Sequence, residues 1–209
     1  AEMKSELRFL TPNQVALVEL NHLASDDLFN DDRTYSRINY QLNPSANTQI
    51  EITGEYASDT NYFEDLSQST NESSRTHLTR DIVFKSFDKN WILNVGMTNY
   101  QMLDDQPKCL AIGVCEQNDP YRLKPYVNFN GNWQSKESDI NFNIDSEIIF
   151  FDHLQSESGR RLKNRTTLSK IFNHSGIEVK PSLGLDYAKF ESDSNEDDTK
   201  RTIPIYSLD

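Results

Sequence analysis

Val127-Asn-Phe-Asn-Gly-Asn-Trp133 is the stretch that decides the fold, and its neighbour Ile140-Asn-Phe-Asn-Ile-Asp145 repeats the same scheme. In both stretches an apolar residue or a glycine alternates with asparagine or aspartate. Successive side chains of a β-strand point to opposite faces of the sheet, so each stretch predicts a strand with one apolar and one polar face.

The same two-residue alternation recurs along most of the chain, whereas helical periodicity is nearly absent. The longest case runs from Ile177 to Tyr187, with Pro181 among its odd, apolar positions. Another case is Trp91–Met97, and weaker ones lie around Leu7, Val18, Ile38, Ile50 and Ile82. Together they predict about eleven strands, many of them near the ~9–11 residues that a tilted strand needs to cross a bilayer.

The joints between these strands alternate between short and long. The short ones are Pro12-Asn13, Pro44-Asn47, Asp88-Asn90, Ser135-Ser138 and His174-Gly176, and the long polar ones are Asp26-Asp32, Thr60-Thr76, Asp104-Arg122 and Ser192-Lys200, with Ser156-Gly159 intermediate. In an up-and-down meander successive joints lie at opposite ends of the strands. Short turns at one end and long loops at the other are typical of outer-membrane β-barrels. The sequence therefore predicts an all-β fold, an antiparallel up-and-down meander of about eleven strands of a transmembrane β-barrel.

The chain begins and ends inside strand-like segments. Bacterial single-chain barrels use even strand numbers, and about eleven is odd. We therefore expect residues 1–209 to be an excerpt of a single outer-membrane β-barrel domain whose remaining strands lie elsewhere. No apolar run approaches the length of a membrane helix.

The composition indicates a water-filled barrel interior and argues against nucleic acid as a partner. Only 35% of the 209 residues are hydrophobic, as expected where one face of every strand meets water. The net charge of -12 leaves no basic footprint for phosphate, so nucleic acid is not an expected partner. Acidic residues cluster in two joints, at Asp26–Asp32 and at Asp193–Asp198. Solvated loops are the ordinary explanation, and divalent-cation binding by carboxylate oxygens is the alternative.

The two cysteines, Cys109 and Cys115, lie in one long loop. Two cysteines at this spacing can close a small local disulfide in an oxidising compartment, or remain thiols. A metal site would need more ligands, and no histidine lies nearby in the sequence.

Candidate contact residues come from the polar faces and from the basic clusters. The polar positions of the two deciding stretches are predicted to face the barrel lumen: Asn128, Asn130, Asn132, Asn141, Asn143 and Asp145. Basic residues near strand ends are candidates for contacting phosphorylated headgroups, or alternatively for pairing with neighbouring carboxylates: Arg122, Lys124, Arg160 and Arg161. Aromatic residues near predicted strand ends fit a membrane interface, although any β protein carries some: Tyr35, Tyr56, Trp91, Tyr100, Tyr126, Trp133 and Tyr187.

Catalytic signatures are missing from the sequence. There is no dinucleotide fingerprint, phosphate loop, nucleophile elbow or zinc-protease motif. Asp152 and His153 are adjacent, but neighbours in a strand point to opposite faces, so the carboxylate would orient the imidazole poorly. We expect no enzymatic activity and no cofactor.

A series of segments along the chain forms a further signal: Ser5–Pro12, Leu23–Asp27, Arg33–Tyr40, Tyr62–Leu66, Asn99–Leu103, Pro120–Pro125, Gly159–Arg161 with Pro181 and Tyr187, and Arg201–Asp209. In this order they resemble the LPS-assembly protein LptD family, also called OstA or Imp. The resemblance covers essentially the whole chain.

The resemblance implies that residues 1–209 are the early to middle strands of a large barrel in the outer membrane of a Gram-negative bacterium, with the closing strands absent from this chain. It implies lipopolysaccharide as the transported molecule, an LptE-type lipoprotein as the plug, and membrane lipid around the barrel. A periplasmic β-jellyroll, absent from this chain, would receive lipopolysaccharide from the transenvelope Lpt bridge. The lipid would reach the outer leaflet through a seam between the first and last strands. No family disulfide carries over to Cys109 and Cys115.

Three functions thus fit the sequence in different degrees. The leading one is a non-enzymatic barrel component that inserts lipopolysaccharide into the outer leaflet. A diffusion porin would share the strand pattern without the ordered family segments. A soluble, lipocalin-like binding protein would instead turn its apolar face inward around a ligand.

Overall fold

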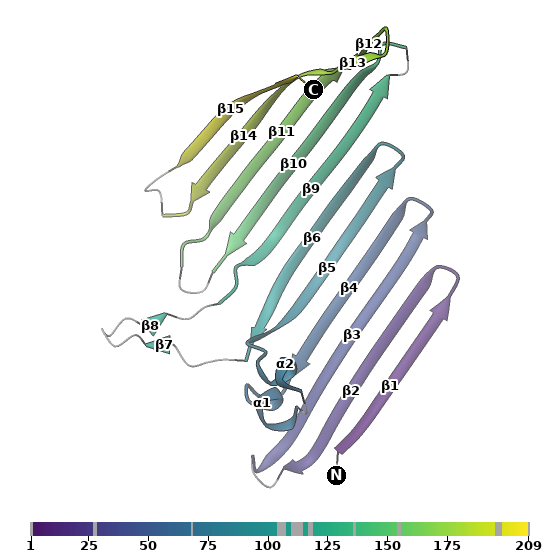
Figure 1. The fold of residues 1–209 in the computed structure, drawn as a ribbon. Helices are drawn as coiled ribbons and strands as arrows, with labels where there is room; N and C mark the ends of the chain where they lie inside the picture. Colours follow the sequence, from purple (N-terminus) through teal and green to yellow (C-terminus); the bar gives the residue numbers. More distant parts are fainter. Residues whose placement is uncertain are drawn as a thin grey trace. The chain divides into compact units, whose positions relative to one another are not determined.

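The structure, a computed structural model, describes residues 2–26, 29–67, 69–103, 108–109, 115–116, 119–135, 137–153, 156–194 and 198–208. Its main sheet has eleven strands in the order β1-β2-β3-β4-β5-β6-β9-β10-β11-β14-β15, and consecutive strands are neighbours (Figure 1). The predicted all-β antiparallel meander of eleven strands is confirmed. In the described part of the chain, no helix is both long and apolar enough to cross a membrane.

The main-sheet strands are β1 (Glu2–Thr11), β2 (Gln14–Asp26), β3 (Asp31–Ser45), β4 (Thr48–Ala57), β5 (His77–Asp88), β6 (Trp91–Met102), β9 (Arg122–Ser135), β10 (Ile140–Asp152), β11 (Gly159–Lys170), β14 (Pro181–Ser192) and β15 (Thr199–Leu208). Two short ladders pair β7 (Lys108–Cys109) with β8 (Cys115–Glu116), and β12 (Phe172–His174) with β13 (Ile177–Val179). The helices are α1 (Tyr62–Leu66) and α2 (Thr70–Ser73).

The lengths of the joints between strands alternate as predicted, with two differences. The predicted long joint at Asp26-Asp32 is short, because β2 and β3 extend into it and pair Asp26 with Asp31. Arg33 bonds the Asp26 carboxylate and so offsets the repulsion that would separate these acidic ends. The single strand predicted from Ile177 to Tyr187 is divided at Lys180, and β12–β13 forms a separate hairpin beyond the main sheet.

The residues group into two compact units. One comprises Ala1–Val83, Met97–Arg122 and His153–Gln155, and the other comprises Phe84–Gly96, Leu123–Asp152 and Ser156–Asp209. We call them unit 1 and unit 2.

In unit 1, strand pairing sorts side chains onto two faces. One row across β1 to β4 is apolar, because Leu7 lies opposite Val18, which lies opposite Ile38. Leu7 and Ile38 are exposed, Leu7 at 67%, and Val18 is half-buried. The next row is charged: Glu6 lies opposite Glu19, Glu19 opposite Arg37, and Arg37 opposite Glu55. The pair Leu10 and Val15 places apolar side chains on the polar face, and no contact among the described residues explains it.

The segment between β4 and β5 folds back onto unit 1 and carries α1 and α2 (Figure 1). We call its residues 58–67 and 69–76 the cap. A small hydrophobic core joins the cap to the strand ends. The core consists of Tyr62 and Phe63 from α1, Tyr35 from β3, Ala57 from β4, Leu78 from β5 and Leu103 after β6, with Leu66 packed against it. The rings of Tyr35, Tyr62 and Phe63 contact one another, and the Tyr35 and Phe63 rings meet edge to face at 5.1 Å.

Unit 2 shows the same separation of faces. Phe142 lies opposite Leu168, Leu168 opposite Leu183, and Leu183 opposite Tyr206. Leu168, Leu183 and Tyr206 in this row are exposed, with Leu183 at 59%, and Phe142 is half-buried. On the other face Asp145 lies opposite Arg165, which lies opposite Asp186. Ile203 and Ile205 of β15 are exceptions on this polar face, and nothing in the described structure accounts for them.

Three of the predicted interface aromatics lie in two different settings. Trp91 and Trp133 belong to a row of stacked or tilted rings, Trp91–Phe129–Trp133–Phe142, with centroid distances of 6.2, 6.3 and 5.8 Å. This row lies on the apolar face of unit 2, beside the short turns. By contrast, the Tyr35 ring is buried in the core under the cap, which periodicity alone did not indicate.

Candidate functional site

All six residues predicted to face the lumen lie on the polar face of unit 2. A side-chain hydrogen bond from Asn132 to Asn143 joins the asparagine rows of β9 and β10. Since side chains alternate along each strand, the remaining four share this face: Asn128, Asn130, Asn141 and Asp145. Four of the six line a cavity of about 610 Å³ near the short turns: Asn130, Asn132, Asn143 and Asp145. Orientation toward a lumen stays a prediction.

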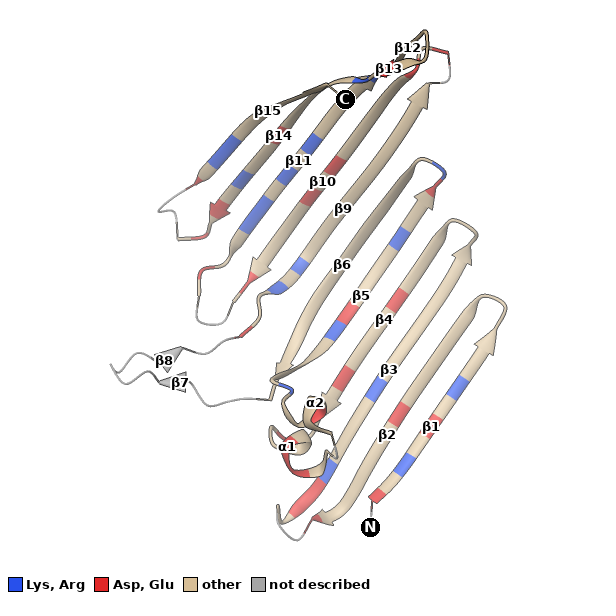
Figure 2. Ribbon diagram, viewed as in Figure 1, with Lys and Arg blue, Asp and Glu red and all other residues tan. Residues whose placement is uncertain are grey.

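Ion pairs run across the polar face of unit 2 next to these asparagines. Arg161 donates to Glu147 at 2.9–3.0 Å, and Lys163 lies 3.7 Å from the same carboxylate. Arg165 lies between Asp145 and Asp186 in the strand register. In Figure 2 the basic positions of β11 stand beside acidic positions of β10. The face is therefore polar and locally charge-balanced, which suits contact with water or with neutral polar groups.

The four basic residues predicted to contact headgroups do not form one cluster. Arg160 and Arg161 are adjacent in β11 and so point to opposite faces. Arg160 pairs with Glu191, and Lys124 lies 3.3 Å from Asp152. Arg122 lies half-buried at the start of β9. Lys124, Arg160 and Arg161 thus each have a carboxylate partner, and contact with headgroups stays a prediction.

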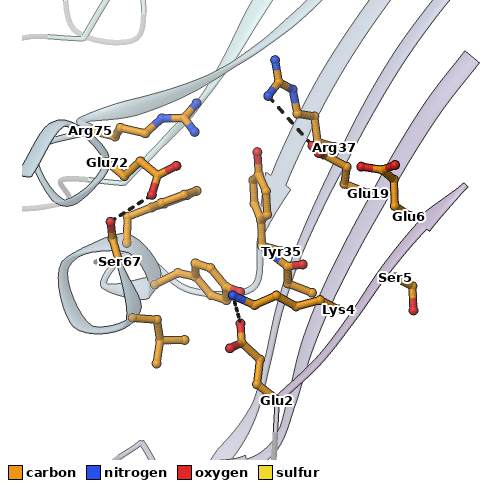
Figure 3. A pocket seen from close by; sticks show the side chains of 14 residues that line it. Glu2, Lys4, Ser5, Glu6, Glu19, Tyr35, Arg37, Ser67, Glu72 and Arg75 are labelled. Atoms are coloured by element: carbon orange, nitrogen blue, oxygen red, sulfur yellow. Dashed lines mark hydrogen bonds and ion pairs between the residues drawn. The ribbon is translucent and has the colours of Figure 1, made fainter. Parts of the chain in front are cut away.

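A pocket of about 510 Å³ opens on the polar face of unit 1, between the cap and the first strands (Figure 3). Its floor is formed by charged side chains of β1 to β3, and its roof by α1, α2 and the residues that flank them. The residues named in Figure 3 include Glu2, Lys4, Glu6, Glu19, Tyr35, Arg37, Ser67, Glu72 and Arg75. Carboxylates of the floor have basic partners: Lys4 lies 3.3 Å from Glu2, and Arg37 lies 3.9 Å from Glu19.

Arg33 is the most buried charged side chain in the described structure, at 1% exposure. Its Nε and Nη2 donate to the two carboxylate oxygens of Asp59 at 3.0 and 2.7 Å, a bidentate pair. Its Nη1 donates to Asp65 at 2.9 Å and to Asp26 at 3.2 Å. The guanidinium also lies over the Phe29 ring, 4.8 Å from its centroid. One residue of β3 thus joins the end of β2 to both the start of the cap and α1.

A second arginine attaches the far end of the cap. Arg75 pairs with Glu55 of β4, which also accepts a hydrogen bond from the Tyr35 hydroxyl at 2.8 Å. The Arg75 guanidinium lies over the Phe63 ring, 4.7 Å from its centroid. Burial raises the pKa of Tyr62, and the Glu2 carboxylate adds to that effect. The Tyr62 phenol therefore holds its proton more tightly than an exposed tyrosine does.

Neither arginine attachment was predicted from the sequence. The sequence signal for the first attachment is the position of Arg33, a basic residue directly after the acidic joint Asp26-Asp32. Its partners Asp59 and Asp65 lie 26 and 32 positions further on, too far for a local pattern to connect them.

The described residues form no metal site, and the two cysteines are placed by their backbone alone. Within the described ranges, no three or more His, Cys, Asp or Glu side chains gather as metal ligands would. The backbone of Cys109 pairs with that of Cys115 in the β7–β8 ladder. Their side chains lie outside the described part of the chain, so the disulfide stays a prediction.

Comparison with known proteins agrees with the order of segments noted in the sequence. Residues 31–209 match the family model of LptD, LPS transport system D. The LPS-assembly protein LptD of Aromatoleum aromaticum is 26% identical over 216 residues, which cover 100% of this chain and 26% of that protein. The protein of the same name from Chromobacterium violaceum is 25% identical over 211 residues, covering 99% of this chain and 26% of the relative.

A third relative, the LPS-assembly protein LptD of Thiobacillus denitrificans, is 27% identical over 173 residues, covering 81% of this chain and 22% of that protein. The chain spans about a quarter of the length of these relatives. The match to the family model extends over most of the sheet, from β3 to β15. The chain belongs to the LptD family.

Proposed function

We propose that this chain is a segment of a single outer-membrane β-barrel that takes part in placing lipopolysaccharide in the outer leaflet of a Gram-negative bacterium. The observation that carries the proposal is the two-faced sheet: the strands expose one apolar face and present an asparagine-rich, ion-paired face on the other side. Membership of the LptD family supports lipopolysaccharide as the molecule that is moved.

The apolar face has the properties of a surface that meets hydrocarbon. Leu7 and Leu183, in different units, are 67% and 59% exposed, whereas such residues are normally covered in a protein that meets only water. The main-sheet strands have from 10 residues in β1 to 15 in β3, enough to cross a bilayer when tilted. The ring row from Trp91 to Phe142 lies at the short-turn end, where the apolar band of a barrel meets the headgroups.

The polar face suits a watery interior through which sugars pass. Its asparagines supply both donors and acceptors, and its ion pairs leave little unbalanced charge to hold a ligand tightly. The proposal assigns no covalent chemistry and no cofactor to this segment. It includes membrane lipid, an LptE-type lipoprotein plug inside the barrel, and delivery by the periplasmic Lpt bridge through a jellyroll outside this segment.

Depletion of the full-length protein tests this function. Its gene is placed under a regulated promoter, and surface lipopolysaccharide is labelled as the protein is lost. We expect surface lipopolysaccharide to fall before growth stops, with porin-mediated solute uptake unchanged. Normal surface lipopolysaccharide together with reduced solute uptake would contradict the assembly role and favour a diffusion pore.

A further inference from the structure

One of the joints predicted to be short carries a hairpin of its own. The other joints of this group have two to four residues between main-sheet strands, whereas residues 171–180 connect β11 to β14 through the β12–β13 ladder (Figure 1). At its base, Ile171 donates its backbone N–H to the carbonyl oxygen of Asp139 at 3.0 Å. At its tip, Ser175 and Gly176 have φ values of 51° and 83°, as a two-residue type I′ turn requires. The hairpin is therefore a formed element beyond the main sheet.

Strand pairing gives this hairpin an apolar face and a polar face. The outer two pairs share one face, which holds three apolar side chains and a histidine: Phe172, Val179, His174 and Ile177. The middle pair lies on the other face: Asn173 and Glu178. Phe172 is 51% exposed and Ile177 is 67% exposed. An isolated two-stranded hairpin is marginally stable in water, and a group of exposed apolar side chains marks a contact surface. The apolar face therefore needs a surface to pack on.

The apolar face of the hairpin continues the apolar face of unit 2. Lys170, the last residue of β11, lies on the same face as Leu168, because two positions separate them. The Lys170 ammonium lies 5.0 Å from the centroid of the Phe172 ring, which places this ring at the end of the same face. Leu208 lies opposite Pro181 at this end of the strands and is 74% exposed. The surface proposed to meet hydrocarbon thus extends past the strand ends onto the hairpin.

The charges beside the hairpin suit the surface of a bilayer. Lys170 precedes the hairpin and Lys180 follows it, and neither ammonium forms an ion pair with a carboxylate of the described residues. A lysine at the edge of an apolar surface can lay its methylene stem on that surface while its ammonium meets lipid phosphates. Two lysines around an apolar face therefore favour a phospholipid surface as the partner.

We propose that the β12–β13 hairpin is an interfacial anchor, which inserts its apolar face into the headgroup layer of a phospholipid leaflet and places Lys170 and Lys180 at the lipid phosphates. The inference rests on the proposed barrel function, because that function supplies the bilayer. The short turns of outer-membrane barrels lie on the periplasmic side, so the partner is the phospholipid of the periplasmic leaflet. The hairpin gives this rim of the barrel a lipid contact in addition to that of the strands.

The test places the photoreactive amino acid p-benzoylphenylalanine at single positions of the full-length protein. Phe172 and Ile177 are replaced on the apolar face of the hairpin, and Asn173 and Glu178 are the matched controls on its polar face. Replacement of Leu183, on the apolar face of β14, reports the lipid contact of the sheet itself. The purified proteins are irradiated in vesicles of phosphatidylethanolamine and phosphatidylglycerol with radiolabelled acyl chains. Cells that make the same proteins are irradiated in parallel.

We expect positions 172 and 177 to take up several-fold more lipid label than positions 173 and 178, and about as much as position 183. Replacing phosphatidylglycerol by phosphatidylcholine should lower the label at position 172, and an unchanged label would contradict the role of the two lysines. Label at 183 together with equally low label at all four hairpin positions would overturn the anchor while the barrel function stands. A protein-sized adduct at 172 or 177 in cells would also overturn it, in favour of a protein partner. Absence of lipid label at 183 as well would overturn the barrel function and this inference with it.

Discussion

Arg33 shows how one buried side chain organises residues that are distant in the sequence. Its five donors match the oxygens of Asp26, Asp59 and Asp65, which come from three separate segments. A lysine would supply a point charge without the bidentate geometry that Asp59 receives. The residue therefore decides where the cap lies on unit 1.

Arg33→Met should loosen the cap. Removing one partner from a buried charge cluster destabilises by roughly 3–5 kcal/mol, because the remaining charges lose their compensation. We expect faster trypsin cleavage after Arg75, at the end of the cap, in the full-length protein in detergent. Arg37→Met, exposed on the same face, is the control and should leave the rate unchanged. Equal rates for Arg33→Met and wild type would contradict the attachment of the cap by Arg33.

Gly131 permits the ring row on the apolar face. A Cβ atom at this position would overlap the six-membered ring of Trp133. Gly131→Ala should therefore displace Trp133 from Phe129 and Phe142, at an overpacking cost of about 1–3 kcal/mol. The measurement is the emission maximum of Trp133 in a protein whose other tryptophans are replaced by phenylalanine. Gly54→Ala, where the new Cβ lies 3.1 Å from one methyl group of Ile38, should leave that emission unchanged.

At the scale of elements, β11 divides its basic residues between two environments. Arg161 joins the ion pairs on the polar face, and Arg160 pairs with Glu191 on the other face. Two arginines that are adjacent in the sequence therefore lie on opposite faces of the strand and do not form one cluster.

Cysteine labelling separates these two positions. In the full-length protein in vesicles, Arg161→Cys should react quickly with a charged, water-soluble maleimide. Arg160→Cys should react more slowly, because its face meets the lipid boundary. Reaction at equal rates, with both variants folded, would mean that the two faces of β11 meet the same medium.

The cap is the element whose stability should depend on alkaline pH. Burial raises the pKa of Tyr62 above its ordinary value of 10.0, with the Glu2 carboxylate adding to the effect. The folded cap therefore holds the Tyr62 proton more tightly than the unfolded segment does. This stabilisation is fully present below pH 10 and is lost as the pH rises through and above that value.

We expect protection of the cap from hydrogen exchange to fall as the pH rises above 10, after correction for the intrinsic exchange rate. Tyr62→Phe, which cannot ionise, should remove that part of the decrease. An identical alkaline decrease in Tyr62→Phe would show that another group is responsible.

At the scale of the whole molecule, alternation and joint length were sufficient to predict the meander. Polar and apolar residues alternate along whole strands, with Asn130 in the polar set and Phe142 in the apolar set. Such long alternating segments indicate directly which face of the sheet each side chain occupies. The order of the family segments, from Ser5 to Arg201, added the expected function. The sequence thus predicted the strands and the polar face well.

The parts that the sequence did not predict depend on contacts between distant residues. Arg33 meets Asp59 and Asp65 only after β4 has returned beside β3, and no local period encodes that meeting. Tyr35 resembled an interface aromatic because it lies near a strand end, but the cap buries it. The extension of β2 to Asp26 likewise depends on Arg33, which offsets acidic repulsion.

The most direct test of the account measures which medium meets each face. Nitroxide labels are placed at Leu183 and Phe142 on the apolar face and at Asn130 on the polar face, in the full-length protein reconstituted in bilayers. We predict that the labels at 183 and 142 collide with oxygen dissolved in hydrocarbon, while the label at 130 collides with a water-soluble nickel complex. Aqueous accessibility at 183 and 142 together with a shielded label at 130 would contradict the membrane barrel.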